Sequence, residues 1–305
     1  MRPFRFGLIM TSIESRTSWR DRARRIENAG FSVLLAPDHF ALPLAPVPAL
    51  MSAAEATSTL RVGTYVLAAG FRHPAVLAKE AASLDVLTGG RFELGLGAGW
   101  NSAEFARAGI PFERGRIRFE QVADAVQIIK ASLAGGPVTY AGTRYTTEGV
   151  ECPIRPVQNP LPLLLGGGGR RMLTFAAREA AIVGLMGVAR GGVIDMSTLG
   201  EKATRRRIDW IRDAAGQRFD DLELNLFMNQ SWLTGDRVAA AAEIARAGSL
   251  DPAMVLESPH YLLGTADEMR EQLIRVRAEL GVSYFSFFER DLPQIAGVVG
   301  DLASA

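Results

Sequence analysis

The sequence predicts an α/β fold, a parallel (β/α)8 TIM barrel with a small insertion hairpin. Short apolar segments alternate with longer amphipathic segments along the 305 residues. Eight apolar segments have the length and composition of strands, and helical patterns fill the gaps between them. This alternation indicates parallel strands joined by crossover helices. Eight strands match a closed barrel, and a doubly wound open sheet is the alternative.

The first half of the chain is expected to form four strands and four helices. The strands are Phe4–Met10, Phe31–Ala36, Leu60–Leu67 and Phe92–Leu96, which are short apolar runs. The helices are Ser18–Ala29, Ala49–Thr57, Ala75–Leu87 and Arg116–Leu133, where apolar residues recur at helical spacing. Pro74 stands at the first turn of the third helix, where its missing N–H costs no hydrogen bond.

The second half continues the same rhythm after one interruption. Within Pro137–Val150, β-type residues recur in alternation, and we interpret this segment as a hairpin inserted in the region 135–160. The remaining strands are Leu161–Leu165, Ala181–Leu185, Leu222–Phe227 and Ser283–Phe288; the helices are Arg171–Arg178, Leu199–Ala215, Arg237–Ala247 and Ala266–Leu280. Composition does not shift along the chain, so one domain over 1–305 is expected.

Composition and charge exclude several function classes. Lys plus Arg (34) and Asp plus Glu (33) nearly cancel, so no nucleic-acid partner is expected. No apolar stretch reaches the length of a membrane span. A single cysteine, Cys152, excludes an intramolecular disulfide and fits a cytoplasmic protein. The three histidines share no metal-ligand spacing, so no metal is expected. One of them, His260, precedes the last strand, and its side chain could face either toward the site or away from it.

Barrel enzymes carry their chemistry after the carboxyl ends of the strands. There, after the second strand, stand Asp38, His39 and Phe40, and we expect Asp38 to contact a cofactor. His39 could act as a general acid or base, or contact a cofactor, because histidine titrates near neutral pH. Alternatively, Asp38 caps a turn and His39 packs beneath it. We predict that Phe40 lines the substrate pocket, and His73, which follows the third strand, either lines it or closes the turn before Pro74.

A second candidate segment follows the fourth strand. Gly97, Ala98 and Gly99 would let the backbone approach a flat ring, and Trp100 would form a wall of the substrate pocket. The alternative is that the glycines serve a tight turn from strand to helix.

The run Gly166, Gly167, Gly168 and Gly169 follows the fifth strand and leads into a helix that starts near Arg170. Successive glycines let backbone N–H groups converge, and the helix N-terminus adds a positive dipole. Arg170 and the next residue, Arg171, could add charge-assisted hydrogen bonds. The run therefore predicts a phosphate site, and the alternative is a flexible turn with solvated arginines.

These segments occur together with further motifs in a familiar order. The motifs are Asp38-His39, Phe71-Arg72-His73-Pro74, Leu84–Arg91, Leu94–Trp100, Pro153…Pro156-Val157-Gln158, Gly166–Gly169, Leu263-Gly264-Thr265 and Gly281–Tyr284. The set resembles the actinobacterial deazaflavin-dependent branch of the luciferase-like monooxygenase superfamily, and the similarity runs nearly from end to end.

The resemblance implies a barrel that holds the tricyclic ring of coenzyme F420, or alternatively FMN, at the strand carboxyl ends. It places the cofactor's phosphate at the glycine run and His39 near the reactive centre of the ring. Members often carry a bulge with a non-prolyl cis peptide in the third strand; here that would fall at Tyr65-Val66, against the ring, with Ala68 nearby. The resemblance also implies a homodimer formed through barrel helices.

The resemblance implies an oxidoreductase acting on a small molecule. The sugar-phosphate dehydrogenase of this group has a glutamate where Trp100 stands and a tryptophan where the chain reads Ala41-Leu42-Pro43, which argues against sugar-phosphate oxidation. We expect hydride transfer to or from an electron-poor C=C or C=N bond. The alternatives are an FMN-dependent monooxygenase that uses reduced flavin and oxygen, and a barrel that binds a cofactor without catalysis.

Overall fold

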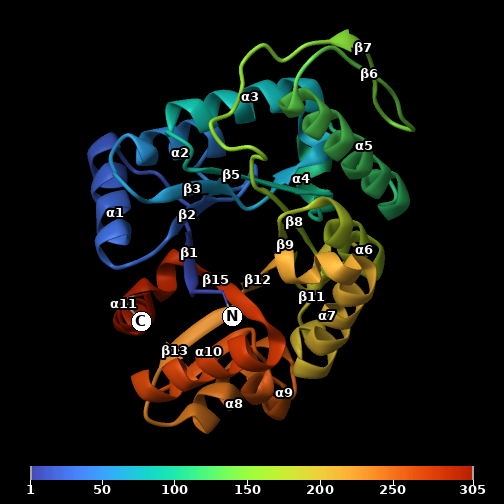
Figure 1. Cartoon of the computed structure of the whole chain (residues 1–305). Helices are drawn as coiled ribbons and strands as arrows, with labels where there is room; N and C mark the ends of the chain where they lie inside the picture. Colours follow the sequence, from blue (N-terminus) through green and yellow to red (C-terminus); the bar gives the residue numbers. More distant parts are fainter. Residues whose placement is uncertain (1, 304–305) are drawn as a thin grey trace.

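The computed structural model describes residues 2–303, in which eight parallel strands close into a barrel (Figure 1). The strands are β1 (Arg5–Ile9), β2 (Val33–Ala36), β3 (Arg61–Thr64) continued by β4 (Leu67–Ala68), β5 (Phe92–Gly97), β8 (Leu163–Gly167), β9 (Ile182–Leu185), β12 (Glu223–Phe227) and β15 (Val282–Phe288). Each pairs in parallel with its neighbours, and β3 pairs with β5 to close the sheet. The predicted barrel is confirmed, and each predicted strand matches one of these.

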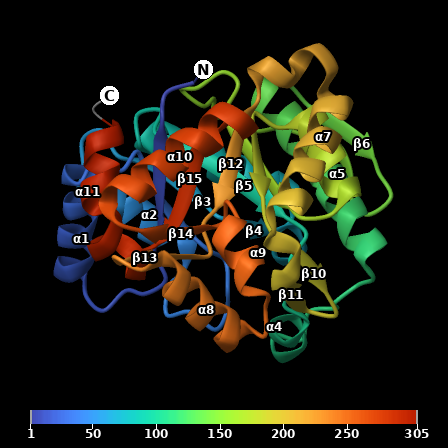
Figure 2. The same ribbon diagram turned by 90° about the horizontal axis from the view of Figure 1, so that it is seen from below.

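Helices surround the strands on the outside of the barrel (Figures 1 and 2). The predicted helices correspond to α1 (Arg16–Asn28), α2 (Pro46–Ala54), α3 (Pro74–Leu87), α5 (Gly115–Ala134), α6 (Arg170–Glu179), α7 (Glu201–Ala215), α8 (Arg237–Gly248) and α10 (Ala266–Leu280). Three more were not predicted: α4 (Ser102–Arg107), α9 (Pro252–Glu257) and α11 (Leu292–Ala303). Among the described residues, no helix is long and apolar enough to span a bilayer.

Additional strand pairs lie outside the barrel. The predicted insertion hairpin is formed by β6 (Val138–Ala141) and β7 (Thr146–Val150), which pair antiparallel. An unpredicted hairpin, β10 (Val188–Arg190) with β11 (Val193–Asp195), directly follows β9. A parallel pair, β13 (Gln230–Leu233) with β14 (Tyr261–Gly264), was also not predicted. Figure 2 shows β10, β11 and α4 together at the end of the barrel opposite the N-terminus.

The third barrel strand is interrupted where the bulge was expected. Tyr65 and Val66 separate β3 from β4, and a cis peptide joins them. Thr64 pairs with Gly95 of β5 through its hydroxyl, which donates to the carbonyl oxygen (2.9 Å) and accepts from the N–H (2.8 Å). A Cβ at Gly95 would lie 2.0 Å from the Thr64 carbonyl oxygen, so only glycine allows this approach.

Ion pairs fill the N-terminal end of the barrel. Arg5 at the start of β1 pairs with Glu93 of β5 and Glu223 of β12. Arg61 at the start of β3 also reaches Glu93, with Nε 2.6 Å from Oε1. The guanidinium of Arg5 lies over the Tyr284 ring, 4.5 Å from its centroid. These contacts fill the N-terminal end of the barrel, and parallel barrels hold their sites at the opposite, carboxyl end of the strands.

Candidate functional site

A cavity of about 270 Å³ opens at the carboxyl ends of the barrel strands. Most of the predicted site residues line it: Asp38, His39, Tyr65, Val66, Ala68, Gly97, Ala98, Gly99, Trp100 and Gly166–Gly169. The hairpin β10–β11 contributes further lining through Val188, Ala189 and Ile194. Ligand pockets typically enclose roughly 300–1,000 Å³. The cavity is therefore large enough for part of a ligand, such as a flat ring, whose remainder would extend outward.

Three residues predicted for the site do not line this cavity, and for His73 the structure shows the alternative role at the turn before Pro74. Phe40 does not line the cavity: it is 59% exposed, and its ring packs on that of Phe71, with the centroids 4.8 Å apart. His73 caps α3, since its Nδ1 accepts a hydrogen bond from the Ala75 N–H at 3.3 Å. Arg170, the first residue of α6, is exposed to solvent and does not line the cavity.

His39 is held by a carboxylate that the sequence did not single out. Its Nδ1 lies 2.7 Å from Oε2 of Glu104, whose side chain is only 6% exposed. Glu104 is in the first turn of α4, and Asn101 caps this helix, because its side-chain oxygen accepts a hydrogen bond from the Ala103 N–H. A carboxylate that accepts the Nδ1 proton leaves Nε2 as the nitrogen that can exchange a proton. The edge of the His39 ring also contacts Trp100, with the centroids 5.4 Å apart.

Asp38 is a positioning residue for the loop that carries His39. Its Oδ1 accepts from Arg72 at 3.1 Å, and its Oδ2 accepts from Arg72 at 2.5 Å and from the Ala68 N–H at 3.1 Å. These bonds tie the end of β2 to the segment after β4. Asp38 therefore fixes the wall of the cavity, and both its oxygens already have partners.

The glycine run forms one side of the cavity and supplies Gly169 as the N-cap of α6. A Cβ at Gly168 would lie 2.4 Å from the Gly187 carbonyl oxygen, so the run packs tightly against the chain after β9. No atom lies within 4 Å of a Cβ built on Gly169. The first N–H groups of a helix have no partner within it, and they favour an anion. The structure thus offers a tight backbone turn with open space in front of a helix N-terminus.

Arg118 adds an unforeseen cation to the cavity wall. It lies on α5, and its guanidinium carbon stands 3.9 Å from the centroid of the Phe112 ring. Burial lowers the pKa of Arg118, and its buried Nε has no hydrogen-bond partner. Its Nη1 donates to the Glu113 carbonyl oxygen at 2.6 Å, and among residues 2–303 no carboxylate pairs with its charge, which favours an anionic group of a ligand at this wall.

His260, whose orientation the sequence left open, is fully buried and does not line the cavity. Its Nδ1 lies 2.7 Å from the Phe227 carbonyl oxygen, and its Nε2 lies 3.2 Å from Thr204 Oγ1. Burial lowers the pKa of His260 to about 4, so the neutral ring is favoured. Among residues 2–303, no group of three or more His, Cys, Asp or Glu side chains could hold a metal ion.

A glycine-lined cavity beside a histidine that contacts a buried carboxylate, at the carboxyl end of a parallel barrel, lies where barrel proteins of this class bind small molecules. Residues 2–302 match the luciferase-like monooxygenase family, and the chain belongs to that family.

Several relatives are similar over part of the chain. It is 34% identical over 160 residues to an F420-dependent glucose-6-phosphate dehydrogenase of Beutenbergia cavernae, which covers 50% of this chain and 47% of the relative. A protein of the same description from Nakamurella multipartita is 27% identical, covering 88% of this chain and 80% of the relative. An FMNH(2)-dependent dimethylsulfone monooxygenase of Pseudomonas putida is 28% identical, and the match covers 57% of this chain and 50% of the relative. For several of these relatives the chain spans about half their length.

Solved structures share the fold. The coenzyme F420-dependent tetrahydromethanopterin reductase from Methanopyrus kandleri superposes with a TM-score of 0.78 at 19% identity, covering 99% of this chain and 98% of that one. A long-chain alkane monooxygenase superposes with a TM-score of 0.79 at 13% identity, and the match covers 100% of this chain and 92% of that one. At these identities the likeness concerns the fold.

Proposed function

We propose that the protein is a coenzyme F420-dependent oxidoreductase that transfers a hydride to or from an electron-poor C=C or C=N bond of a small metabolite. The observation that carries this proposal is the 2.7 Å contact between His39 Nδ1 and Glu104 Oε2 at the edge of a glycine-lined cavity. The F420-dependent relatives support the choice of cofactor.

The residues of the cavity fit a deazaflavin with a phosphate in its tail. The backbone of Gly97–Gly99, together with Val66, would hold the ring, because no large side chain extends from these glycines. The N–H groups at Gly167–Gly169 and the start of α6 would hold the phosphate. Trp100 would close the cavity on the side of His39.

When bound, F420 supplies two electrons as a hydride, and the protein supplies position and electrostatics. His39 Nε2 would deliver the proton that accompanies the hydride, or accept it in the reverse direction. Glu104 would keep the ring in one orientation and stabilise its protonated form. Arg118 would bind an anionic group of the substrate. Trp100 stands where the sugar-phosphate dehydrogenases of this group carry a glutamate, so we propose a substrate other than a sugar phosphate.

A thermal-shift titration with F420 and FMN under matched conditions tests the cofactor. We expect F420 to raise the melting temperature at lower concentration than FMN. Stabilisation by FMN alone would contradict the proposal and favour an FMN-dependent monooxygenase. The similarity to the Pseudomonas putida relative is the reason to consider this alternative. Oxygen consumption with reduced FMN would then identify that activity.

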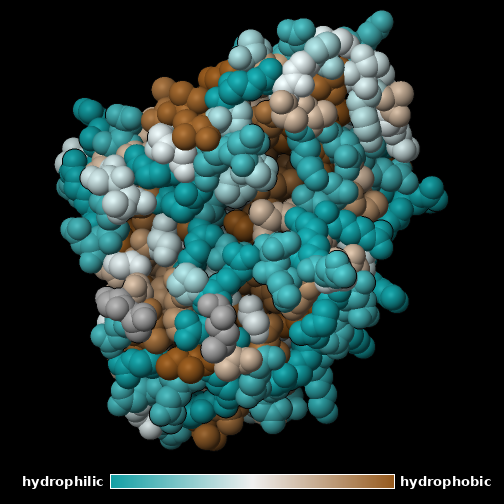
Figure 3. Space-filling view, in the orientation of Figure 1, coloured by the Kyte–Doolittle hydropathy of each residue, from teal (hydrophilic) through white to brown (hydrophobic). Residues whose placement is uncertain are grey.

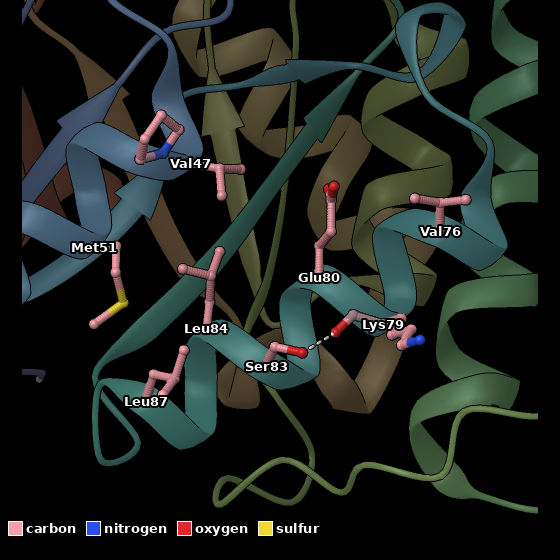
Figure 4. A pocket seen from close by; sticks show the side chains of 9 residues that line it. Val47, Met51, Val76, Lys79, Glu80, Ser83, Leu84 and Leu87 are labelled. Carbon is pink, nitrogen blue, oxygen red and sulfur yellow. Dashed lines mark hydrogen bonds between the residues drawn. The ribbon is translucent and has the colours of Figure 1, made fainter.

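We also propose that the protein forms a homodimer through α2 and α3. An apolar hollow of about 450 Å³ separates these helices on the outer surface. Figure 4 shows Val47 and Met51 of α2 opposite Leu84 and Leu87 of α3, and Figure 3 shows an apolar patch over these helices. Leu87 is 62% exposed, and exposed apolar patches of this kind mark interfaces.

Light scattering after size-exclusion chromatography tests the dimer. We expect the native chain to elute as a dimer and Leu87→Lys as a monomer, because the substitution places a charge in the contact. Val238→Lys, at an equally exposed position on α8, is the matched control and should remain a dimer. A dimeric Leu87→Lys protein, or a monomeric native chain, would contradict this interface.

A further inference from the structure

The glycine run has a buried cation behind it. Arg207, on α7, is 2% exposed, and its Nε donates to the Gly168 carbonyl oxygen at 3.2 Å. Its Nη2 donates to the carbonyl oxygen of Thr198, three residues before α7 begins. Its Nη1 is buried and has no hydrogen-bond partner. The guanidinium thus lies directly against the segment that we expect to bind phosphate.

This cation has no counter-ion in the part of the chain that the structure describes. None of the ion pairs among residues 2–303 includes Arg207. The charged group that acts on it is the like-charged Arg206, and burial together with Arg206 lowers the pKa of Arg207 to about 10. The nearby His260 is buried and favours the neutral form. Leaving a charge buried without a partner is costly, so a protein keeps one where it has a use for it.

We propose that Arg207 is the positioning residue and counter-charge of the phosphate site, and that a bound phosphate group compensates its charge. This inference rests on the proposed function, because it takes the cofactor's phosphate to lie at the glycine run. The C=O and N–H of a trans peptide point in opposite directions. The bond from Arg207 to the Gly168 carbonyl oxygen therefore turns the Gly169 N–H away from the guanidinium, as an anion site in front of α6 requires.

The same guanidinium links the glycine run to the hairpin β10–β11. Thr198, which accepts from Arg207, receives a hydrogen bond on its Oγ1 from the Val188 N–H at 2.9 Å. Val188 and Gly168 both line the cavity. Arg207 thus fixes two walls of the same cavity, and its removal should loosen both at the phosphate site.

Thermal unfolding in inorganic phosphate, at ionic strength matched with sodium chloride, tests the proposal. Phosphate should raise the melting temperature of the native chain and of Arg206→Met, the exposed neighbour on the same helix. In Arg207→Met the apparent phosphate affinity should fall on the order of tenfold or more, because the unscreened charge is lost. Each protein is compared with its own phosphate-free sample, so a change in basal stability does not obscure the result.

Two further variants separate charge from hydrogen bonding and replace Arg207→Met if that protein does not fold. Arg207→Lys keeps the charge and should retain part of the phosphate effect. Arg207→Gln keeps donors for a carbonyl oxygen and should lose the phosphate effect. An equal phosphate response in the native chain and in all three variants, or no response in the native chain, would overturn the proposal.

Fluorescence titration with F420 distinguishes this inference from the proposed function. If F420 binds the native chain and Arg207→Met equally well, Arg207 has no role in the site although the proposed cofactor stands. If phosphate binding depends on Arg207 while F420 does not bind at all, the anion site stands and the proposed cofactor is wrong.

Discussion

At the N-terminal end of the barrel Arg5 lies between Glu93 and Glu223, whereas at the carboxyl end Arg118 and Arg207 have buried guanidinium nitrogens without partners. Both ends are built from charged side chains. In the first set each charge has an opposite charge beside it, and the ion pairs fill that end of the barrel. In the second set neither arginine has a carboxylate partner among residues 2–303; Arg118 lines the cavity, and Arg207 lies behind its glycine wall. The difference indicates that the first end serves stability and the second serves a ligand, as in other parallel barrels.

The largest expected effect is on stability at the compensated end. Arg5→Met removes the partner that the carboxylates of Glu93 and Glu223 share: Glu93, 3% exposed, keeps Arg61, whereas Glu223, 9% exposed, has no other ion pair among residues 2–303. Breaking a buried ion pair in this way costs about 3–5 kcal/mol. Urea unfolding should show a loss of this size, and Arg25→Met, an exposed residue of α1, should show almost none. Equal stability of the two variants would remove the distinction between the two ends.

At the carboxyl end we expect losses of turnover with little loss of stability. His39→Asn should lower turnover roughly 10²–10⁴-fold, the usual contribution of a general acid or base. Glu104→Gln should lower turnover less, roughly 10–100-fold, because Glu104 acts through His39. The F420 dissociation constant should stay unchanged in both, and His73→Asn, outside the cavity, is the control.

The proton-transfer role of His39 fails if His39→Asn turns over an identified substrate as fast as the native chain. A parallel loss of F420 binding and turnover in Glu104→Gln would instead show that Glu104 supports the cavity as a whole.

A smaller effect, on the pH dependence of stability, is expected from His260. It lies near the carboxyl end of the barrel, and both its ring nitrogens have hydrogen-bond partners. Its pKa is lowered from 6.5 to about 4, so the unfolded chain binds a proton that the folded chain rejects. Stability is therefore complete above pH 6.5 and is lost as the pH falls toward 4. Between pH 7 and pH 5 the loss should be about 2 kcal/mol.

Urea unfolding of the native chain and of His260→Gln at these two pH values measures this loss. The variant should lack that part of the pH dependence, while other titrating groups, such as Asp291 with its pKa raised by burial to about 6, act equally in both proteins. An identical pH dependence in the two proteins would show that His260 does not titrate as proposed.

The barrel could be predicted because its strands are buried on both faces, which makes them nearly continuous apolar runs such as Leu161–Leu165. The split between β3 and β4 followed from the family resemblance, since an apolar run does not show a bulge. The unpredicted helices α4 and α9 and the two strands of the unpredicted hairpin β10–β11 are each at most six residues long. Such short segments depend on tertiary contacts, for example the close approach of Gly192 to Ser102, and carry no periodic signal.

The candidate site could be predicted where glycines or a histidine follow a strand. Glu104, Arg118 and Arg207 were missed because each lies within a helix and not directly after a barrel strand. Arg207 did carry a signal, since Thr204, Ile208 and Ile211 lie on the same helix face and all are buried. An arginine on an apolar face is a candidate for a buried charge. Phe40 and His73 could not be excluded, because sequence position does not show which way a loop side chain points.

A crystal structure of the protein with F420 would show where the cofactor binds. We expect the ring in the cavity beside His39, with the phosphate at Gly167–Gly169 in front of α6. A cofactor bound with its phosphate elsewhere, or with its ring away from His39, would contradict it.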